Sequence, residues 1–475
     1  MNLQRPETIL LSPRGERQGE GRDARLRGVP FGRHPRRGMV MIVTLIVTFA
    51  LAAMVLVLCR SMSVEMQASA NLQASVQASA VERAAEQYVL AMLAQEGRNV
   101  TSVGEEQFAG IPVGDGWFWV LRPDFDDPSL PTFGFVEESS KVNLNTASYE
   151  QLLMLPGMTE DVASAIMEWK DEDETIERSG PESEYYLSLP DPYFSKNDLF
   201  ETVEETLLVR GMTREMLYGT GPHPPLGSLT RTSISTGTDP AIARGLYESL
   251  TVYSRERNRT VTGERRINVA EMRARNSLQQ MLIKQLSQQR ATEIMALIGT
   301  QPTVDVFDFY FKARLTPDEF TKIEDYITGD SSRSASGRIN VNSASRDVLL
   351  TLETLDSSDV DKLIAGRKGQ NSTGSLAWVP DVLGPKAVGI GNRITARSFQ
   401  YSADICAVSG NGRSFKRVRV VIDTRSGTPQ IVYRRDNTDR GWPMDRAVLT
   451  SLRTGQGPGP ATMSNPRGTL TTGGM

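Results

Sequence analysis

The chain is poor in the side chains on which most catalytic sites depend. Its 475 residues include only two histidines and two cysteines. His34 lies in an Arg-rich N-terminal region and His223 in a Gly-Pro segment, so no triad of nucleophile, base and orienting acid suggests itself. The sequence also lacks a phosphate-binding loop ending in Lys-Ser or Lys-Thr, a CxxC pair and an HExxH motif. We therefore expect a protein that is not an enzyme and has no cofactor.

The two cysteines do not form a disulfide framework. Cys59 lies at the end of an apolar run, and Cys406 lies far along the chain. Stability must therefore come from packing, for which the hydrophobic content of 39% is ordinary.

Charge is absent from one long run, residues 39–59, in which only Thr44 and Thr48 are not apolar. Such a helix, at about 1.5 Å per residue, crosses the roughly 30 Å core of a bilayer. Arg33, Arg36 and Arg37 precede it, and a cationic cluster holds that side in the cytoplasm. We expect a single-pass membrane protein whose residues after Arg60 are exported.

The junction before this run is unusual for a signal peptide, whose apolar core is shorter and ends in small residues. Here Gly38 stands directly between Arg37 and Met39, which begins the apolar helix. Residues 1–38 resemble the basic leader of type IV prepilins, which a membrane-embedded prepilin peptidase cuts after a glycine. The resemblance implies cleavage between Gly38 and Met39 and methylation of the new N-terminus.

The apolar run continues as a predicted helix over 39–96, because this stretch has neither Gly nor Pro. Near its end one apolar stripe is predicted, with Glu82, Arg83 and Gln87 facing away from it. The residues of the stripe are Val81, Ala84, Ala85, Tyr88 and Met92. Gly97 is the expected stop.

Strand patterns occur at both ends of the exported part. Residues 117–121 and 133–137 are aromatic and β-branched, and three further strands are predicted at 399–408, 415–423 and 429–435. The fold class expected is α+β: a long N-terminal helix packed on an antiparallel sheet that carries a large all-α insertion. The sheet domain would comprise 97–140 and 398–441, the insertion 141–397, and a disordered tail 442–475.

The insertion contains repeats. Residues 141–170 (KVNLNTAS…) are echoed by 338–368 (RINVNSAS…), with one residue added in the central turn, and each copy is expected to form two helices joined by a hairpin. Pro156 and Gly157 form the first predicted turn, and Thr159 can cap the helix after it. The Gly-Met-Thr at Gly211 is a half copy, and residues 266–274 repeat the entry of the later copy.

Such a hairpin resembles the helix-hairpin-helix of DNA-uptake receptors and repair enzymes, which is the sharpest alternative. DNA-binding hairpins present a second glycine and flanking cations to phosphates. Here Thr159, Glu160 and Asp161 follow Gly157, and the chain after removal of the leader has 44 basic and 53 acidic residues. We therefore expect no nucleic-acid binding.

Two acidic groups are candidates for calcium, since hard cations take clustered carboxylates. One comprises Asp171, Asp173 and Glu174, within the run 171–174, and the other Asp124, Asp126 and Asp127. A solvated acidic loop is the alternative reading of both.

From Arg36 to Arg435, the order of these features resembles the K-class minor pseudopilin of the type II secretion system. The features are the leader, the long helix, the strands, VNLNTAS, LLVRGMT, INVNSAS and the closing meander. The resemblance implies an inner-membrane subunit with its exported part in the periplasm, which acts in protein export across the outer membrane. Its partners would be the I-, J- and H-class minor pseudopilins, the major pseudopilin and the prepilin peptidase. The long leader and extended tail depart from the pattern and leave a divergent pilus-like machine open.

The lack of a glutamate at one position indicates where the subunit lies in the fibre. In pilins and major pseudopilins the fifth mature residue is glutamate, which pairs with the N-terminal amine of a neighbour, and here it is Val43. A lone carboxylate at that depth is costly unless paired. We therefore expect a tip subunit. The alternatives are a membrane-anchored DNA receptor and a plain tethered adaptor.

Overall fold

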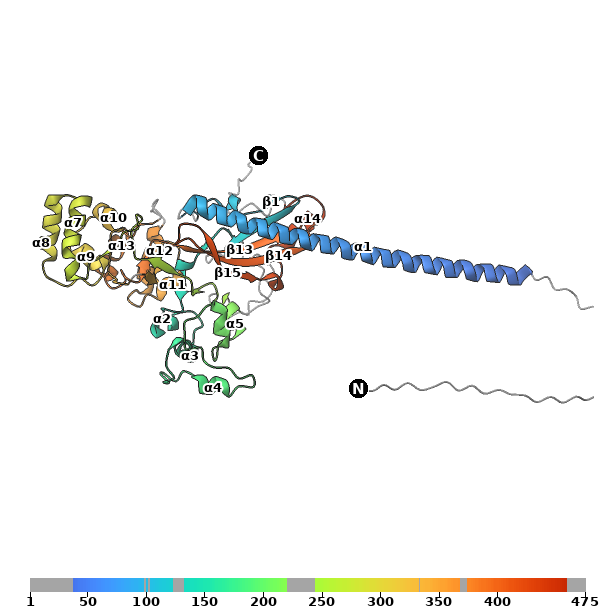
Figure 1. Cartoon of the computed structure of the whole chain (residues 1–475), viewed down its shortest axis with the longest axis horizontal. Coiled ribbons are helices and arrows are strands. Elements are labelled where there is room, and N and C mark those ends of the chain that lie inside the picture. Colours follow the sequence, from blue (N-terminus) through green and yellow to red (C-terminus); the bar gives the residue numbers. More distant parts are fainter. Residues whose placement is uncertain are drawn as a thin grey trace, which may run out of the picture. The chain divides into compact units, whose positions relative to one another are not determined.

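A computed structural model describes residues 37–97, 100, 103–122, 132–219, 244–332, 334–367 and 374–458. The predicted leader up to residue 36 and the candidate calcium residues Asp124, Asp126 and Asp127 lie outside these ranges. The chain divides into two compact units, Met1–Gln67 and Ala68–Met475 (Figure 1).

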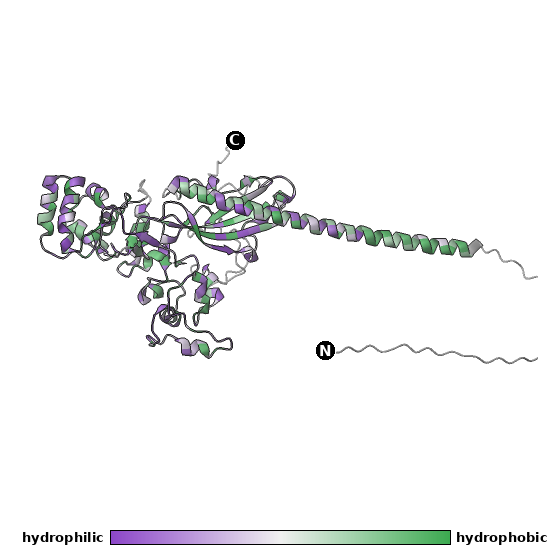
Figure 2. Ribbon diagram, in the orientation of Figure 1, coloured by the Kyte–Doolittle hydropathy of each residue, from purple (hydrophilic) through white to green (hydrophobic). Residues whose placement is uncertain are grey.

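The predicted long helix is confirmed as α1 (Arg37–Glu96). It ends where predicted, because Gly97 adopts a φ of +54° that other residues avoid. Its first half is long and apolar enough to cross a membrane, and the most apolar part has no buried residues. The ribbon of this half is coloured almost throughout as hydrophobic in Figure 2.

Within the second unit, the last turns of α1 pack on a sheet. The side chains that point into this core recur every three or four residues: Ala74, Ala78, Val81, Ala85, Val89 and Leu93. The prediction that Glu82 faces away is wrong. Glu82 is buried and accepts a hydrogen bond of 2.7 Å from Arg434, since the helix face in contact with the sheet is wider than the apolar stripe.

The main sheet has seven strands, all antiparallel, and α1 runs along it (Figure 1). The path is β1 (Ile111–Val113), β2 (Gly116–Arg122), β13 (Gln400–Val408), β14 (Phe415–Asp423) and β15 (Gln430–Asp436). β3 (Thr132–Phe133) pairs with β2, and β4 (Val136–Glu137) pairs with β13.

The sheet confirms that strands on either side of the insertion pair, since β2 lies against β13. The strand predicted over 133–137 is divided into β3 and β4. Gly134 separates them with a φ of +140°, which breaks the extended run.

The insertion is not all-α as predicted. Its helices are α2 (Tyr149–Leu153), α3 (Glu160–Lys170), α4 (Ser183–Leu187), α5 (Arg214–Tyr218), α7 (Arg275–Gln285), α8 (Gln288–Ile298), α9 (Val306–Lys312), α10 (Pro317–Ile323), α11 (Arg346–Leu350), α12 (Ser357–Arg367) and α13 (Val379–Leu383). Three parallel two-stranded ribbons accompany them: β5 (Val142–Asn143) with β6 (Leu250–Thr251), β8 (Ile267–Asn268) with β9 (Ile327–Thr328), and β11 (Ile339–Asn340) with β12 (Ile394–Thr395). A fourth ribbon is antiparallel, β7 (Arg255–Arg257) with β10 (Ser334–Ser336).

The three parallel ribbons define three modules with the same chemistry. Each opening strand ends in an asparagine whose Oδ1 accepts a hydrogen bond from the N–H two residues on: Asn143, Asn268 and Asn340. Each closing strand ends in a threonine whose Oγ1 does the same: Thr251, Thr328 and Thr395. Such local bonds turn the chain out of the strand. The predicted entry at 266–274 therefore opens a full module.

The tail predicted to be disordered is folded over its first part. Residues 446–453 form α14 (Arg446–Arg453), and Met444, Val448 and Leu452 are buried against the main sheet. The ring of Trp442 meets Trp119 edge-on, with centroids 5.9 Å apart. An apolar stripe every three to four residues explains this helix, and the Gly- and Pro-rich composition hid it. Residues 459–475 lie outside the described ranges.

Candidate functional site

The predicted processing junction lies at the start of α1. Gly38 is the second residue of this helix, and Met39 and Val43 follow with 73% and 53% of their surfaces exposed. The helix has no break between the junction and the apolar run, so a cut after Gly38 would leave Met39 as the first residue of a continuous helix.

The two predicted hairpins have matching structures. α11 and α12 have the lengths of α2 and α3, five and eleven residues. The turns between them also match in length, so the extra residue expected in the later turn is not present, and Arg367 takes the place of Lys170. Glu353 and Thr354 take the places of Pro156 and Gly157, and only Gly157 needs its positive φ of +78°.

Both hairpins are locked by a cation at the end of the longer helix. Lys170 Nζ donates to the carbonyls of Leu144 and Ala147, each at 2.9 Å. Arg367 donates in the same way to the carbonyls of Val341 and Ala344. These cations satisfy the module's own backbone, which favours a structural role for the hairpins.

The cap predicted for the first hairpin is observed. Thr159 caps α3 by accepting a hydrogen bond from the N–H of Val162 at 3.3 Å. Gly211 has a φ of +82°, and a Cβ there would lie 3.1 Å from Val162 Cγ2. The glycine of the half copy therefore allows close packing on α3, which requires no ligand.

A clamp of ionic and aromatic side chains holds the first module on the main sheet. Arg419 of β14 donates two hydrogen bonds to Glu248, at 2.7 and 2.8 Å, and its guanidinium lies 4.8 Å from the ring centre of Tyr247. The charge of Arg419 lowers the pKa of Glu248 to about 2, against the effect of burial. Tyr247 in turn donates to Glu204 at 2.8 Å. Together these contacts fix the insertion to the sheet.

Two adjacent buried glutamates join the entry of the insertion to its modules. Glu138 accepts hydrogen bonds from Lys141 at 2.7 Å and from Thr251 at 2.5 Å. Thr251 is the last residue of the strand that closes the first module. Glu137 accepts hydrogen bonds from Asn340 at 2.6 Å and from Ser343, both of which lie at the start of the third module. Burial raises the pKa of Glu137. The sequence offered only a faint signal, two acidic residues inside an apolar segment.

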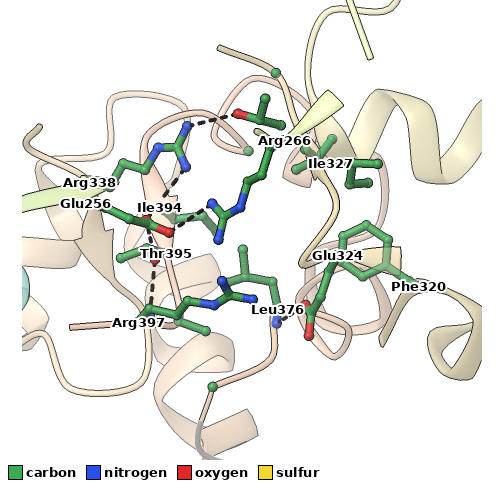
Figure 3. Close-up of a pocket in the computed structure, with 16 residues that line it drawn as sticks. Glu256, Arg266, Phe320, Glu324, Ile327, Arg338, Leu376, Ile394, Thr395 and Arg397 are labelled. Atoms are coloured by element: carbon green, nitrogen blue, oxygen red, sulfur yellow. Dashed lines mark hydrogen bonds and ion pairs between the residues drawn. The ribbon is translucent and has the colours of Figure 1, made fainter. Parts of the chain in front are cut away.

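A small pocket lies between the second and third modules (Figure 3). Its cavity of about 50 Å³ is lined by three arginines, of which Arg266 pairs with Glu256 at 2.9 Å and Arg397 with Asp325 at 2.6 Å. Thr395 donates to Glu256 at 3.2 Å, so the pocket ties the end of the third module to β7. A space of this size suits a few waters, not an organic substrate.

The candidate calcium residues do not converge. Asp171 and Asp173 accept hydrogen bonds from the N–H groups of Asp173 and Thr175, and Glu174 accepts from Ser183 Oγ at 2.9 Å. Across the described parts of the chain, no three acidic, histidine or cysteine side chains are grouped as metal ligands.

Other acceptors, in α3 and in the segment after it, do lack partners. Both carboxylate oxygens of Glu182, Oε2 of Glu168, Ser195 Oγ and Asn197 Oδ1 are buried without a hydrogen bond. Burial and the neighbouring Glu168 raise the pKa of Glu182 to about 8. Buried oxygen acceptors without donors are groups that a hard cation can satisfy. The sequence predicted calcium ligands in the nearby run 171–174 but did not indicate Glu168 or Glu182.

The long helix and the main sheet together define a class of fold. An N-terminal helix with an apolar first half, whose second half packs on an antiparallel sheet, is a pilin-like arrangement, and here the sheet carries three modules between β4 and β13.

The resemblance to K-class pseudopilins is confirmed by a family model. Residues 134–223 match the model described as type II secretion system (T2SS), protein K. Among solved structures the chain is similar to one in the GspK–GspI–GspJ complex of the enterotoxigenic Escherichia coli type 2 secretion system. The identity is 12% over 78% of this chain and 99% of that chain, with a TM-score of 0.42, which does not by itself establish a shared fold. A comparison with curated proteins found no match.

Proposed function

We propose that the protein is a non-enzymatic minor pseudopilin of the K class, which acts in protein export by a type II secretion system. The family match within 134–223 carries this proposal, because it falls in the insertion that distinguishes the chain from a simple pilin-like protein. The helix on its antiparallel sheet supports it.

In this role the protein acts by assembling with other subunits. The prepilin peptidase cuts after Gly38, and Met39 becomes the methylated N-terminus of a helix anchored in the inner membrane, with the later residues in the periplasm. The I- and J-class minor pseudopilins named in the similar complex, together with the H class and the major pseudopilin, are the proposed partners.

The tip of the fibre is the proposed position. Val43 leaves the fifth mature position without a carboxylate, so no neighbour's amine is needed above it. The clamp of Arg419 on Glu248 and Tyr247 also fixes the bulky insertion to the sheet on which another subunit would have to stack. A cap tolerates both features and a shaft subunit does not.

N-terminal sequencing of the membrane form tests the proposed processing. The expected N-terminus is Met39, and replacing Gly38 by a bulky residue should leave the leader attached. A mature protein that retains residues 1–38 would contradict a pseudopilin. It would favour the tethered adaptor, and salt-sensitive DNA binding would favour the uptake receptor.

Buried oxygens without hydrogen bonds support a second role, the binding of calcium. The orphan oxygens of Glu168, Glu182, Ser195 and Asn197 lead us to propose that these residues, at the end of α3 and in the segment after it, bind calcium. Calcium would supply the positive charge that these acceptors lack, and it would hold α4 against α3.

A further inference from the structure

Four arginines share one exposed face of the β7–β10 ribbon and the hairpin after it; we call them the arginine ladder. Arg255, Arg257 and Arg259 are exposed, whereas Glu256, Asn258 and Thr260 between them are buried. Alternate side chains of an extended strand stand on the same face about 7 Å apart. The fourth, Arg265, is exposed and forms an antiparallel bridge with Arg259.

The ladder keeps like charges together at a cost. Residues directly opposite in an antiparallel pair have neighbouring side chains, and like charges there are destabilising. Arg259 and Arg265 stand in that relation. Neither is neutralised locally, because Arg259 donates to the carbonyl of Gly263 at 2.7 Å and Arg265 to the carbonyl of Ser331 at 3.0 Å.

The buried and half-buried carboxylates near the ladder are paired with other arginines, and the exposed Glu264 forms no ion pair with a described residue. The buried Glu256 pairs with Arg266, and Asp325 pairs with Arg397. Among the described residues, none of the four ladder arginines forms an ion pair, whereas the less exposed Arg266, Arg338 and Arg397 do. The unneutralised charge at the surface points to an anionic partner.

The remaining side chains on this face decide between anions. Ser334 and Ser336 of β10 lie opposite Arg257 and Arg255. No aromatic residue occurs from 255 to 265, so bases of a single-stranded nucleic acid would have nothing to stack on. Val261 is the one large apolar side chain in this stretch, 68% exposed, which is little for insertion into a membrane.

We propose that the arginine ladder binds an extended acidic segment of a partner polypeptide with carboxylates at alternate positions. Such a segment has the same repeat as β7, so successive carboxylates meet successive guanidiniums. Guanidinium and carboxylate can pair through two parallel hydrogen bonds. The partner's charge also removes the repulsion between Arg259 and Arg265.

The test compares two labelled peptides of equal charge by fluorescence anisotropy on the full-length protein in detergent. One alternates Glu and Thr, and the other has the same residues with all Glu in one block. We expect the alternating peptide to bind about tenfold more tightly, with affinity that falls as salt is added. Arg257→Ser and Arg259→Ser should each weaken it severalfold, whereas Arg413→Ser, at an exposed arginine outside the ladder, should not.

Thermal unfolding of the ladder variants without peptide should show an unchanged or higher Tm, because the side chains are exposed and repel one another. Equal affinity for both peptides, or loss of binding in Arg413→Ser as well, would overturn the proposal. Tighter binding of single-stranded DNA or anionic lipid vesicles, abolished by Arg257→Ser, would assign the ladder to another class of partner and equally contradict it.

Discussion

At the scale of residues, the clamp on the main sheet depends on the charge of Glu248. Its pKa in the folded protein is about 2, below the ordinary value of 4.5, because of Arg419. A carboxylate with a lowered pKa contributes stability that is present above about pH 4.5 and is lost as the pH falls toward 2.

Glu248→Gln should therefore destabilise the protein by about 1–3 kcal/mol at pH 7, and the difference from wild type should shrink between pH 4.5 and 2. Denaturant unfolding across this pH range measures it. Asp191→Asn, at an exposed carboxylate, is the matched control. A difference that does not change with pH would show that Arg419 and Glu248 do not act as an ion pair.

The acidic loop gives a second prediction at this scale. Millimolar calcium should raise the Tm by several degrees relative to EDTA, since a ligand that binds only the folded state stabilises it. Glu182→Gln should abolish most of the rise, and Glu172→Gln, at an exposed side chain, should retain it. Magnesium should act less, because it requires a smaller and stricter shell. A Tm unaffected by calcium would remove this site.

At the scale of elements, the face of α1 on the sheet carries the fold of the second unit. Leu93 is 2% exposed in this core, whereas Leu72 on the same helix is 68% exposed. Leu93→Ala should cost about 2–4 kcal/mol of unfolding free energy because it leaves a cavity. Leu72→Ala should cost less than about 0.5 kcal/mol. Equal effects in chemical unfolding would mean that the helix does not pack as described.

The sequence predicted elements whose signal is local. The helix from 39 to 96, the strand at 117–121 and the closing meander follow from periodicity and turn residues, and all were found. Partners far apart in the chain were not predictable. Glu82 was placed in solvent because its partner Arg434 lies on β15. The second module was recognised only by its entry, because its closing strand, Ile327–Thr328, is two residues long and pairs with residue 267. The candidate loop was located, but Glu182 becomes a candidate only when burial is known.

At the scale of the whole molecule, the balance of charge predicts that the protein does not bind duplex DNA. After loss of the leader the chain has 44 basic and 53 acidic residues, and the basic side chains of both hairpins bond to carbonyls of their own modules. Duplex DNA should show no measurable binding at physiological salt, where non-specific binders reach roughly 10⁻⁴ to 10⁻⁶ M. Electrophoretic mobility shifts and anisotropy measure it. Micromolar binding that weakens with added salt would instead favour the uptake receptor.

Position in the fibre is the central claim, and cysteine crosslinking along the assembled pseudopilus tests it most directly. A Cys59→Ser background leaves Cys406, which is buried, and single cysteines can then be placed at exposed positions of α1 such as Leu72. The account predicts crosslinks from this chain to one end of the fibre only, none between two copies of it, and assembly that does not require glutamate at position 43. Copies repeated along the shaft, or a Val43→Glu variant that assembles where the wild type fails, would contradict the tip assignment.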